Sequence, residues 1–475
     1  MPSALRFMSM TDTQNFDVVV LGGGPGGYAA ALYGAAAGLN IALIEELRVG
    51  GTCLHRGCIP AKALLQTAEV TRTIKHAGDF GVTSSEPKVD FSAIQNRKNA
   101  VINQMTGGLE GLLKRRKVTV FNDRGSVADA TKKQVTLSDG TIVGATRGLI
   151  LATGSSPREF PGTPYDGEVI LSSDHVLNLE YAPASVVIIG GGAIGCEFAS
   201  YLNEMGSQVT LLEVAPSLLA GCDKDAAAVV QKSFIKRGMT VLAGVNVGSI
   251  ARKGSKGSVT YTDAEGQAQT LDVDAVIVSV GRRPRSEGIG ITEAGIAIDD
   301  RGFVTVDGNM RTNVEGVYAV GDLVATPQLA HVGFAEAMVA IQTLLGEDAT
   351  PIEYGKVPWG IYCHPEVSFC GMTEDKAREA GYDIVVKKEG FIGDGRAVII
   401  GETDGFVKII AEKDGPILGV HIVGPWATEL LAEGYLALNW EATIADIAPL
   451  VHPHPTLSEV FGEAAIALTG RPIHG

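Results

Sequence analysis

The sequence predicts an α/β fold in which two units of the same plan are followed by an α+β segment at the C-terminus. Two glycine-rich turns carry this prediction, because each lies between an apolar strand and a helix and precedes a second strand that ends in an acid. From about Tyr354 onward these turns stop, and short strand-like runs flank a helical pattern. Strand–helix–strand repeats are typical of parallel sheets covered by helices.

The first unit begins with the valine-rich run Phe16–Leu21, which is typical of a buried strand. The turn after it has the sequence Gly-Gly-Gly-Pro-Gly-Gly over residues 22–27, and an alanine-rich helix is expected to continue to Gly38. A second apolar strand, Ile41–Ile44, ends at Glu45.

The second unit repeats this order. Strand Ser185–Ile189 leads into Gly-Gly-Gly-Ala-Ile-Gly over residues 190–195, a helix is expected to reach Met205, and strand Val209–Leu212 ends at Glu213. In a Gly-x-Gly-x-x-Gly turn the first glycine allows the bend, the second admits a pyrophosphate, and the third allows close packing of the helix on the strand. The helix N-terminus binds the phosphates and the acid binds a ribose, so two bound dinucleotides are expected.

A pair of cysteines follows the first unit. Residues 50–62 have the sequence GGTCLHRGCIPAK, in which four residues separate Cys53 from Cys58. Two thiols at this spacing on one helical turn can close a disulfide, and a bridge beside a nucleotide unit suggests a redox-active pair. The alternatives are a buried structural pair or a metal knuckle, but a zinc site needs a second Cys/His pair that the sequence lacks. No metal is therefore expected.

The surroundings of each turn indicate which dinucleotide it binds. The first turn is contiguous with the cysteine pair, so its ligand should be the flavin of FAD, which exchanges electrons with a disulfide. The second stands alone, as a nicotinamide site would. Glu213 should repel a 2′-phosphate, and no arginine follows it before Lys224, which favours NAD over NADP. The alternative is that Glu213 is an ordinary exposed acid at a strand end.

Further runs complete the predicted map. Leu149–Ser155 is expected to be a buried strand that enters a turn, and Val276–Pro284 closes the second unit in a similar way. Gly316–Asp322 is expected to be a strand whose final acid is suited to hold a polyol hydroxyl.

The C-terminal part has a different pattern. Strand-like runs Phe406–Ile410 and Gly419–Val423 precede the helical stretch Thr428–Asn439, which predicts an α+β domain. The expected division is 1–155 for the first part of the FAD domain with the cysteine pair, 156–284 for the NAD domain, 285–352 for the second, central part of the FAD domain, and 353–475 for a dimerisation domain.

A candidate general base lies near the C-terminus, where residues 452–459 have the sequence HPHPTLSE. Because Pro455 follows it, His454 should be presented from a loop. Glu459 is placed to hydrogen-bond the imidazole, which would fix its tautomer and raise its basicity. The alternative is a capping box between Thr456 and Glu459. Both roles can coexist, because a carboxylate has two oxygens.

Composition excludes several functions. The formal net charge of −15 argues against a nucleic-acid partner, and no apolar run is long enough to span a membrane. The first 15 residues lack the apolar core of a secretory signal, and Met8 or Met10 could be the true start. Of six cysteines only two are closely paired, which fits a reducing compartment, so the expected location is cytoplasmic.

These motifs together resemble the flavin disulfide reductases, and most of all their dihydrolipoamide dehydrogenase branch, the E3 components of 2-oxo-acid dehydrogenase complexes. The resemblance extends from Phe16 to nearly the end and rests on GGGPGG, GGTCLHRGCIPAK, LATGS, GGGAIGCE, VGRRP, AVGD, IYCHPEV and HPHPTLSE, in the family's order. It implies two Rossmann-like dinucleotide-binding domains, one for FAD and one for NAD, and a C-terminal dimerisation domain. The alternative is an NAD(P)H-dependent reductase of another small disulfide, similar to glutathione reductase.

The resemblance also implies roles. Cys53 would exchange with the lipoyl group, Cys58 would face the flavin, and His454, oriented by Glu459, would be the base supplied by the other subunit of a homodimer. The protein partner would be a lipoylated E2 or the H-protein of glycine cleavage. The FAD contacts would be Gly22, Gly24, Gly27, Glu45, Gly51, Thr52, Lys62, Gly125, Thr153, Gly154, Asp322, Ala330 and His331. The NAD contacts would be Gly190, Gly192, Ile194, Gly195, Glu197, Glu213 and Gly281.

Three departures from the family pattern stand out. Ala61 stands where the family usually has serine, His55 stands where the family often has asparagine, and residues 334–337 stand where the family usually has an acidic run.

Overall fold

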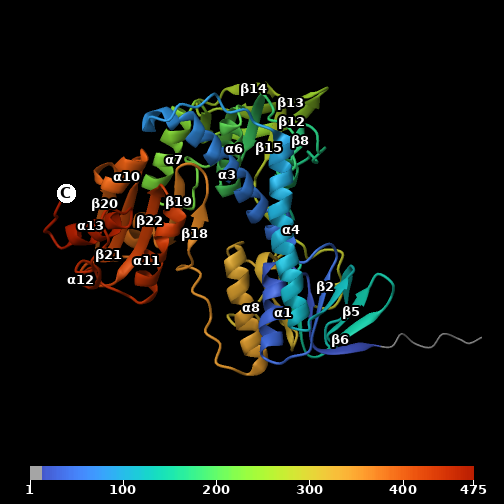
Figure 1. The fold of residues 1–475 in the computed structure, drawn as a ribbon. Coiled ribbons are helices and arrows are strands. Elements are labelled where there is room, and N and C mark those ends of the chain that lie inside the picture. Colours follow the sequence, from blue (N-terminus) through green and yellow to red (C-terminus); the bar gives the residue numbers. More distant parts are fainter. Residues whose placement is uncertain (1–12, 475) are drawn as a thin grey trace, which may run out of the picture. The chain divides into compact units, whose positions relative to one another are not determined.

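The computed structural model describes residues 13–474 (Figure 1). The chain divides into two compact units. The first contains the residues up to Pro60 together with 98–156 and 282–352, and the second contains 61–97, 157–281 and the residues from Glu353 onward. The suggested start at Met8 or Met10 lies outside the described residues. The four-part domain division stays a prediction.

The first unit is built on a seven-stranded sheet in the order β3-β2-β1-β6-β5-β4, with β17 also paired to β6. Its strands are β1 (Gln14–Leu21), β2 (Ile41–Glu45), β3 (Thr119–Asn122), β4 (Gly125–Asp129), β5 (Gln134–Leu137), β6 (Ile142–Leu151) and β17 (Val317–Ala319). β1, β2, β3, β6 and β17 pair in parallel, whereas β4, β5 and β6 pair antiparallel.

The central strand β1 is buried on both faces. Val18 and Val20 pack into one hydrophobic cluster with Ala30 and Ala340 of the helices, while Val19 packs into another on the opposite face. This follows from the two-residue period of a strand. Helix α1 (Pro25–Ala36) contacts α8 (Ala330–Leu345) on the helical face, where the blue and orange helices lie side by side in Figure 1.

The second unit contains a parallel sheet in the order β11-β10-β9-β15-β8. Its strands are β8 (Ile170–Leu171), β9 (Ser185–Ile189), β10 (Gln208–Glu213), β11 (Thr240–Ala243) and β15 (Ala275–Val278). An antiparallel sheet is formed by β12 (Asn246–Lys253), β13 (Lys256–Thr262) and β14 (Ala268–Val273). The helices of this part are α5 (Ser173–Val176), α6 (Ala193–Glu204) and α7 (Lys224–Lys236).

A second five-stranded sheet, antiparallel and in the order β18-β19-β22-β21-β20, forms the C-terminal part of this unit. Its strands are β18 (Trp359–Ile361), β19 (Glu366–Gly371), β20 (Ile384–Gly390), β21 (Phe406–Glu412) and β22 (Ile417–Gly424). Its helices are α9 (Glu374–Glu379), α10 (Gly395–Ile400), α11 (Ala427–Asn439), α12 (Ile444–Ile447) and α13 (Glu459–Leu468). The predicted α+β character of this part is confirmed.

The remaining elements are α2 (Gly51–Arg56), α3 (Cys58–Lys75), α4 (Phe91–Arg115), β7 (Ser155–Pro157), β16 (Arg282–Pro284) and the short 3-10 turns η1 (Ala77–Phe80), η2 (Gly321–Leu323) and η3 (Phe391–Gly393). No helix among residues 13–474 is long and apolar enough to cross a bilayer.

Both runs that were expected to be strands entering a turn leave their strand as expected. The stretch 149–155 contains the end of β6, a short break and the start of β7, and 276–284 contains most of β15, a short break and β16. Both breaks fall at glycines with left-handed backbone, since φ is +72° at Gly154 and +103° at Gly281. A residue in that conformation cannot continue a strand.

Candidate active site

The first glycine turn is shaped by close approaches that only glycine permits. Gly22 has φ of +103°, and a Cβ on Gly27 would collide with the Gly22 carbonyl oxygen. The carboxylate of Glu45 closes the turn, because Oε2 accepts from the Gly23 amide at 2.7 Å and Oε1 from the Leu47 amide at 2.9 Å.

The second turn repeats this geometry. Gly190 has φ of +102°, and a Cβ on Gly195 would collide with the Gly190 carbonyl oxygen. Glu213 accepts from the amide of Gly191 at 2.5 Å and from that of Ala215 at 2.7 Å. Glu213 is therefore a part of the turn and not an ordinary exposed acid.

The middle glycine of each turn faces open space. A Cβ on Gly192 would meet no atom within 4 Å, and one on Gly24 would meet only the Gly51 Cα at 3.9 Å. Both glycines also precede the first residue of a helix, α6 and α1 respectively. The exposed backbone and the helix N-terminus together fit the pyrophosphate of a dinucleotide.

The two thiols do not lie on one helical turn, and that expectation is wrong. Helix α2 ends at Arg56 and α3 begins at Cys58. Gly57 lies between the two helices, and a Cβ there would lie 3.0 Å from the Thr52 carbonyl oxygen and 3.3 Å from the Cys53 Cα, so a larger residue would press against the backbone at Cys53. Cys53 is partly buried and Cys58 is exposed.

Tyr28 of α1 lies within electrostatic range of both thiols. Burial, and after it the charges of Cys53 and Cys58, raise the pKa of Tyr28 to about 12. The phenol therefore stays protonated at neutral pH, and the helix that follows the first glycine turn reaches the cysteine pair.

Lys62, an expected FAD contact, forms an ion pair with Glu197, an expected NAD contact. The Lys62 Nζ donates to both carboxylate oxygens of Glu197 at 2.8 Å, and it also lies 4.6 Å from the centre of the Tyr362 ring. The Tyr362 amide donates to the same carboxylate at 3.0 Å. Glu197 is 6% exposed, so its charge is held by these donors.

His454 and Glu459 are hydrogen-bonded as expected. The imidazole Nδ1 lies 2.9 Å from Glu459 Oε1, while Oε2 accepts from the Thr456 amide at 2.7 Å. Burial alone would raise the pKa of Glu459, but the hydrogen bonds from Thr456 and His454 lower it. A full capping box is not formed, because α13 begins at Glu459 and the Thr456 hydroxyl donates to the Pro453 carbonyl at 2.7 Å.

Comparison with known proteins agrees with this geometry. Residues 16–337 match the pyridine nucleotide-disulphide oxidoreductase family, and 357–465 match the dimerisation domain of the same family. This chain belongs to that family.

Curated relatives place it more closely. The chain is 41% identical to the dihydrolipoyl dehydrogenase of Chlamydia muridarum, covering 97% of this chain and 98% of the relative. It is 38% identical to the dihydrolipoyl dehydrogenase of Bacillus subtilis, covering 97% and 99%. Among solved structures, LpdA of Mycobacterium tuberculosis superposes with a TM-score of 0.88 at 27% identity, covering 96% of this chain and all of that one. The chain therefore belongs to the dihydrolipoyl dehydrogenases.

The family assignment confirms the predicted fold class and the predicted cofactors, FAD and NAD. The roles of individual residues stay predictions. Among the expected FAD contacts, Gly51 and Thr52 begin α2, Ala330 and His331 begin α8, and the Thr153 hydroxyl donates to the Arg285 carbonyl at 2.7 Å.

Gly125 lies in β4, where a Cβ would come within 2.6 Å of Leu21 and 2.9 Å of Val135, so this glycine is needed for packing of the sheet. Ile194, an expected NAD contact, lies in the first turn of α6.

Sequence reasoning missed the residues that hold Asp322. The Ser155 hydroxyl donates to its carboxylate at 2.5 Å, and the Arg282 guanidinium lies 3.6 Å away and donates to Ser155 at 2.6 Å. Ser155 and Arg282 belong to the motifs LATGS and VGRRP, which mark the family but do not by themselves indicate this function. The donors fix the orientation of the acid that is expected to meet the flavin side chain.

Proposed function

We propose that this protein oxidises dihydrolipoyl groups carried by a partner protein and passes two electrons through Cys53 and Cys58 to FAD and then to NAD⁺. The full-length match to dihydrolipoyl dehydrogenases carries the proposal. When bound, FAD would supply the two-electron redox chemistry that connects the protein dithiol with NAD⁺. The first glycine turn, Glu45 and Asp322 would hold it.

The protein's own residues carry out the thiol chemistry. A thiolate of the substrate attacks Cys53 of the Cys53–Cys58 disulfide, which forms a mixed disulfide and releases the Cys58 thiolate. The second substrate thiolate then attacks the substrate sulfur of the mixed disulfide, which closes the lipoyl disulfide and releases Cys53. Cys53 is thus the exchange thiol and Cys58 the one beside the flavin.

His454 supplies the base for these steps. Because the ionised carboxylate of Glu459 can only accept, Nδ1 of His454 carries a proton toward it, and Nε2 is left to accept a proton from the dithiol. Glu459 then stabilises the imidazolium that forms.

We also propose a homodimer in which His454 serves the cysteines of the other subunit. The match to a dimerisation domain supports it. The C-terminal part exposes large apolar side chains, including Val451 at 95%, Ile392 at 77% and Trp440 at 76%. Exposed apolar groups of this size are typical of interfaces. The His454 side chain is itself 77% exposed, so a second subunit can reach it.

The protein partner would be a lipoylated E2 or an H-protein, because the relatives are dihydrolipoyl dehydrogenases. The protein would be located in the cytoplasm, because few of its cysteines are closely paired.

Steady-state kinetics test the proposal against a glutathione reductase-like activity. The purified yellow protein should reduce NAD⁺ with dihydrolipoamide and should show little oxidation of NADH or NADPH with glutathione disulfide. It should also prefer NAD⁺ to NADP⁺, because Glu213, as the acid expected to bind the ribose, would repel a 2′-phosphate. Faster turnover of glutathione disulfide, or a colourless protein, would refute the proposal.

A further inference from the structure

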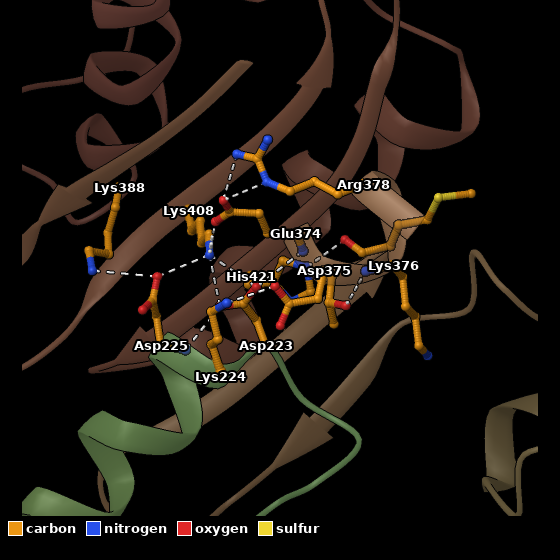
Figure 2. Close-up of polar contacts among 12 residues, drawn as sticks. Asp223, Lys224, Asp225, Glu374, Asp375, Lys376, Arg378, Lys388, Lys408 and His421 are labelled. Atoms are coloured by element: carbon orange, nitrogen blue, oxygen red, sulfur yellow. Dashed lines mark hydrogen bonds and ion pairs between the residues drawn. The ribbon is translucent and has the colours of Figure 1, made fainter. Parts of the chain in front are cut away.

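A buried lysine lies at the centre of an ion cluster in the second unit. Lys408 of β21 is 1% exposed, and its Nζ lies 3.0 Å from both oxygens of Asp223, 3.0 Å from Asp225 and 2.8 Å from Glu374. Figure 2 shows Lys408 pointing into these three carboxylates. Burial alone would lower the pKa of Lys408, but its hydrogen bonds to the carboxylates raise it, so the ammonium stays charged.

The cluster holds the start of two helices. Asp223, 1% exposed, caps α7 by accepting from the Asp225 amide at 3.1 Å, and its other oxygen accepts from the Glu374 amide at the start of α9 at 3.3 Å. A buried carboxylate requires a counter-charge. On the neighbouring strand, burial lowers the pKa of His421, which therefore stays neutral and leaves Lys408 as the cation that faces Asp223.

A short loop connects this cluster to the NAD turn. Residues 214–222 join Glu213 to Asp223. Within the loop the Leu219 amide donates to the Gly191 carbonyl at 2.9 Å, and Leu218 packs so closely that a Cβ on Gly191 would lie 2.6 Å from its Cδ2. Leu218 and Leu219 are buried, so the second half of the loop is fixed on the turn, while Asp223, which follows the loop, is held by Lys408.

The FAD turn has a hydrogen bond that corresponds to the one between Leu219 and Gly191, but the chain after it continues differently. There the Gly50 amide donates to the Gly23 carbonyl at 2.7 Å, in the place that Leu219 and Gly191 take in the second unit. The chain then enters α2 directly, one residue after Gly50. The loop after Glu213 is longer, has no helix of its own and ends at the ion cluster, so Asp223 fixes its C-terminal end.

We propose that Lys408 is a positioning residue for NAD⁺, which holds Asp223 and thereby keeps residues 214–222 closed on the glycine turn at Gly191. The inference rests on the assignment of NAD⁺ to this turn. In this role of Lys408, the C-terminal sheet would contribute to coenzyme binding in addition to the proposed dimer contact. The side chains of the cluster would do so without touching the coenzyme.

The test compares the FAD holoenzyme with its Lys408→Met variant. Calorimetric titration with NAD⁺ should show binding weakened about tenfold, a loss of about 1.4 kcal/mol. The KM for NAD⁺ should rise, while the KM for dihydrolipoamide and the FAD content stay within about twofold of the wild type. Amide hydrogen exchange should accelerate in residues 214–222, because their anchor is lost.

Two further variants keep the test decisive. Lys387→Met removes a lysine of β20, the strand beside β21, whose Nζ lies 3.1 Å from the carboxylate of Glu389. This variant should leave NAD⁺ binding unchanged. Asp223→Asn keeps a capping side chain but removes the charge, and should weaken NAD⁺ binding about threefold even if Lys408→Met does not fold. Unchanged NAD⁺ affinity in a folded Lys408→Met or in Asp223→Asn, with only a lower melting temperature, overturns the inference. A wild-type holoenzyme that does not bind NAD⁺ would instead refute the proposed function.

Discussion

Glu459 uses its two carboxylate oxygens for different tasks, one on the His454 imidazole and one on the Thr456 amide. The second bond holds the carboxylate in place, so the first can set the tautomer of the ring. A glutamine at this position would keep a similar shape but lose the charge.

We therefore expect His454→Gln to lower dihydrolipoamide oxidation by about 10²-fold, the usual share of a general base, while the protein still folds and binds FAD. Glu459→Gln should lower the rate less, about tenfold, because it only orients and polarises the ring. Stopped-flow reduction of the flavin by dihydrolipoamide measures both. Equal losses in the two variants would contradict the division of roles.

The two cysteines differ in their surroundings, because Cys53 is partly buried in α2 and Cys58 is exposed at the start of α3. If Cys58 is the thiol beside the flavin, anaerobic two-electron reduction of the wild type should produce long-wavelength absorbance from the Cys58 thiolate beside oxidised flavin. Cys53→Ser, which has no disulfide to reduce, should show this absorbance without added electrons, and Cys58→Ser should lack it. Both variants should lose lipoamide turnover. Absorbance that survives in Cys58→Ser would mean that the two roles are reversed.

At the scale of elements, the two glycine turns are the same device built twice. Each places its first glycine at φ near +100°, brings its third glycine against the carbonyl of the first, and closes on a glutamate at the end of the second strand. The two copies differ after the glutamate, because the first continues into the cysteine helix and the second into the loop that ends at Asp223.

The second turn allows a matched pair of substitutions. Gly192→Ala meets no atom within 4 Å, so it should change the free energy of unfolding by no more than about 0.5 kcal/mol. It should still weaken NAD⁺ binding about tenfold, because the methyl group occupies the space of the pyrophosphate. Gly195→Ala would strike the Gly190 carbonyl and should destabilise the protein by about 1–3 kcal/mol.

Urea unfolding and NAD⁺ titration separate the two effects. Because both changes leave the first turn intact, FAD content in the folded protein serves as the control. Undiminished NAD⁺ affinity in Gly192→Ala would show that no phosphate approaches this glycine.

At the scale of the whole molecule, the base and the thiols are far apart in sequence and belong to different compact units. A site shared between two subunits would unite them. In such a site the thiols come from one subunit and the base from the other. Two inactive variants should therefore recover activity as a heterodimer, because each supplies the group that the other lacks.

Mixing Cys53→Ser with His454→Gln subunits should give heterodimers with one intact site of two, and so about half of the wild-type rate per dimer. Tagged subunits allow the heterodimers to be isolated before the assay. Homodimers of either variant are the control: Cys53→Ser should be inactive, and His454→Gln should keep only about 1% of the wild-type rate. Purified heterodimers without recovered activity would place both groups in the same subunit's site.

Much of this architecture could be predicted from local sequence. The steric demands of a glycine turn, the period of a buried strand and the acid that ends it are all set by residues close together in the chain. Both turns, with Glu45 and Glu213, were therefore recognisable from the sequence, as was the hydrogen bond between His454 and Glu459, whose partners are five residues apart.

Tertiary structure alone decided the rest. The support of Asp322 by Ser155 and Arg282 joins segments that the sequence separates widely. Lys408 and Asp223 lie 185 positions apart, and either one alone has the pattern of an ordinary surface charge. A buried ion pair of this kind arises only when two distant segments are packed together, because its stability comes from the partner and from the exclusion of water, and neither is encoded near either residue.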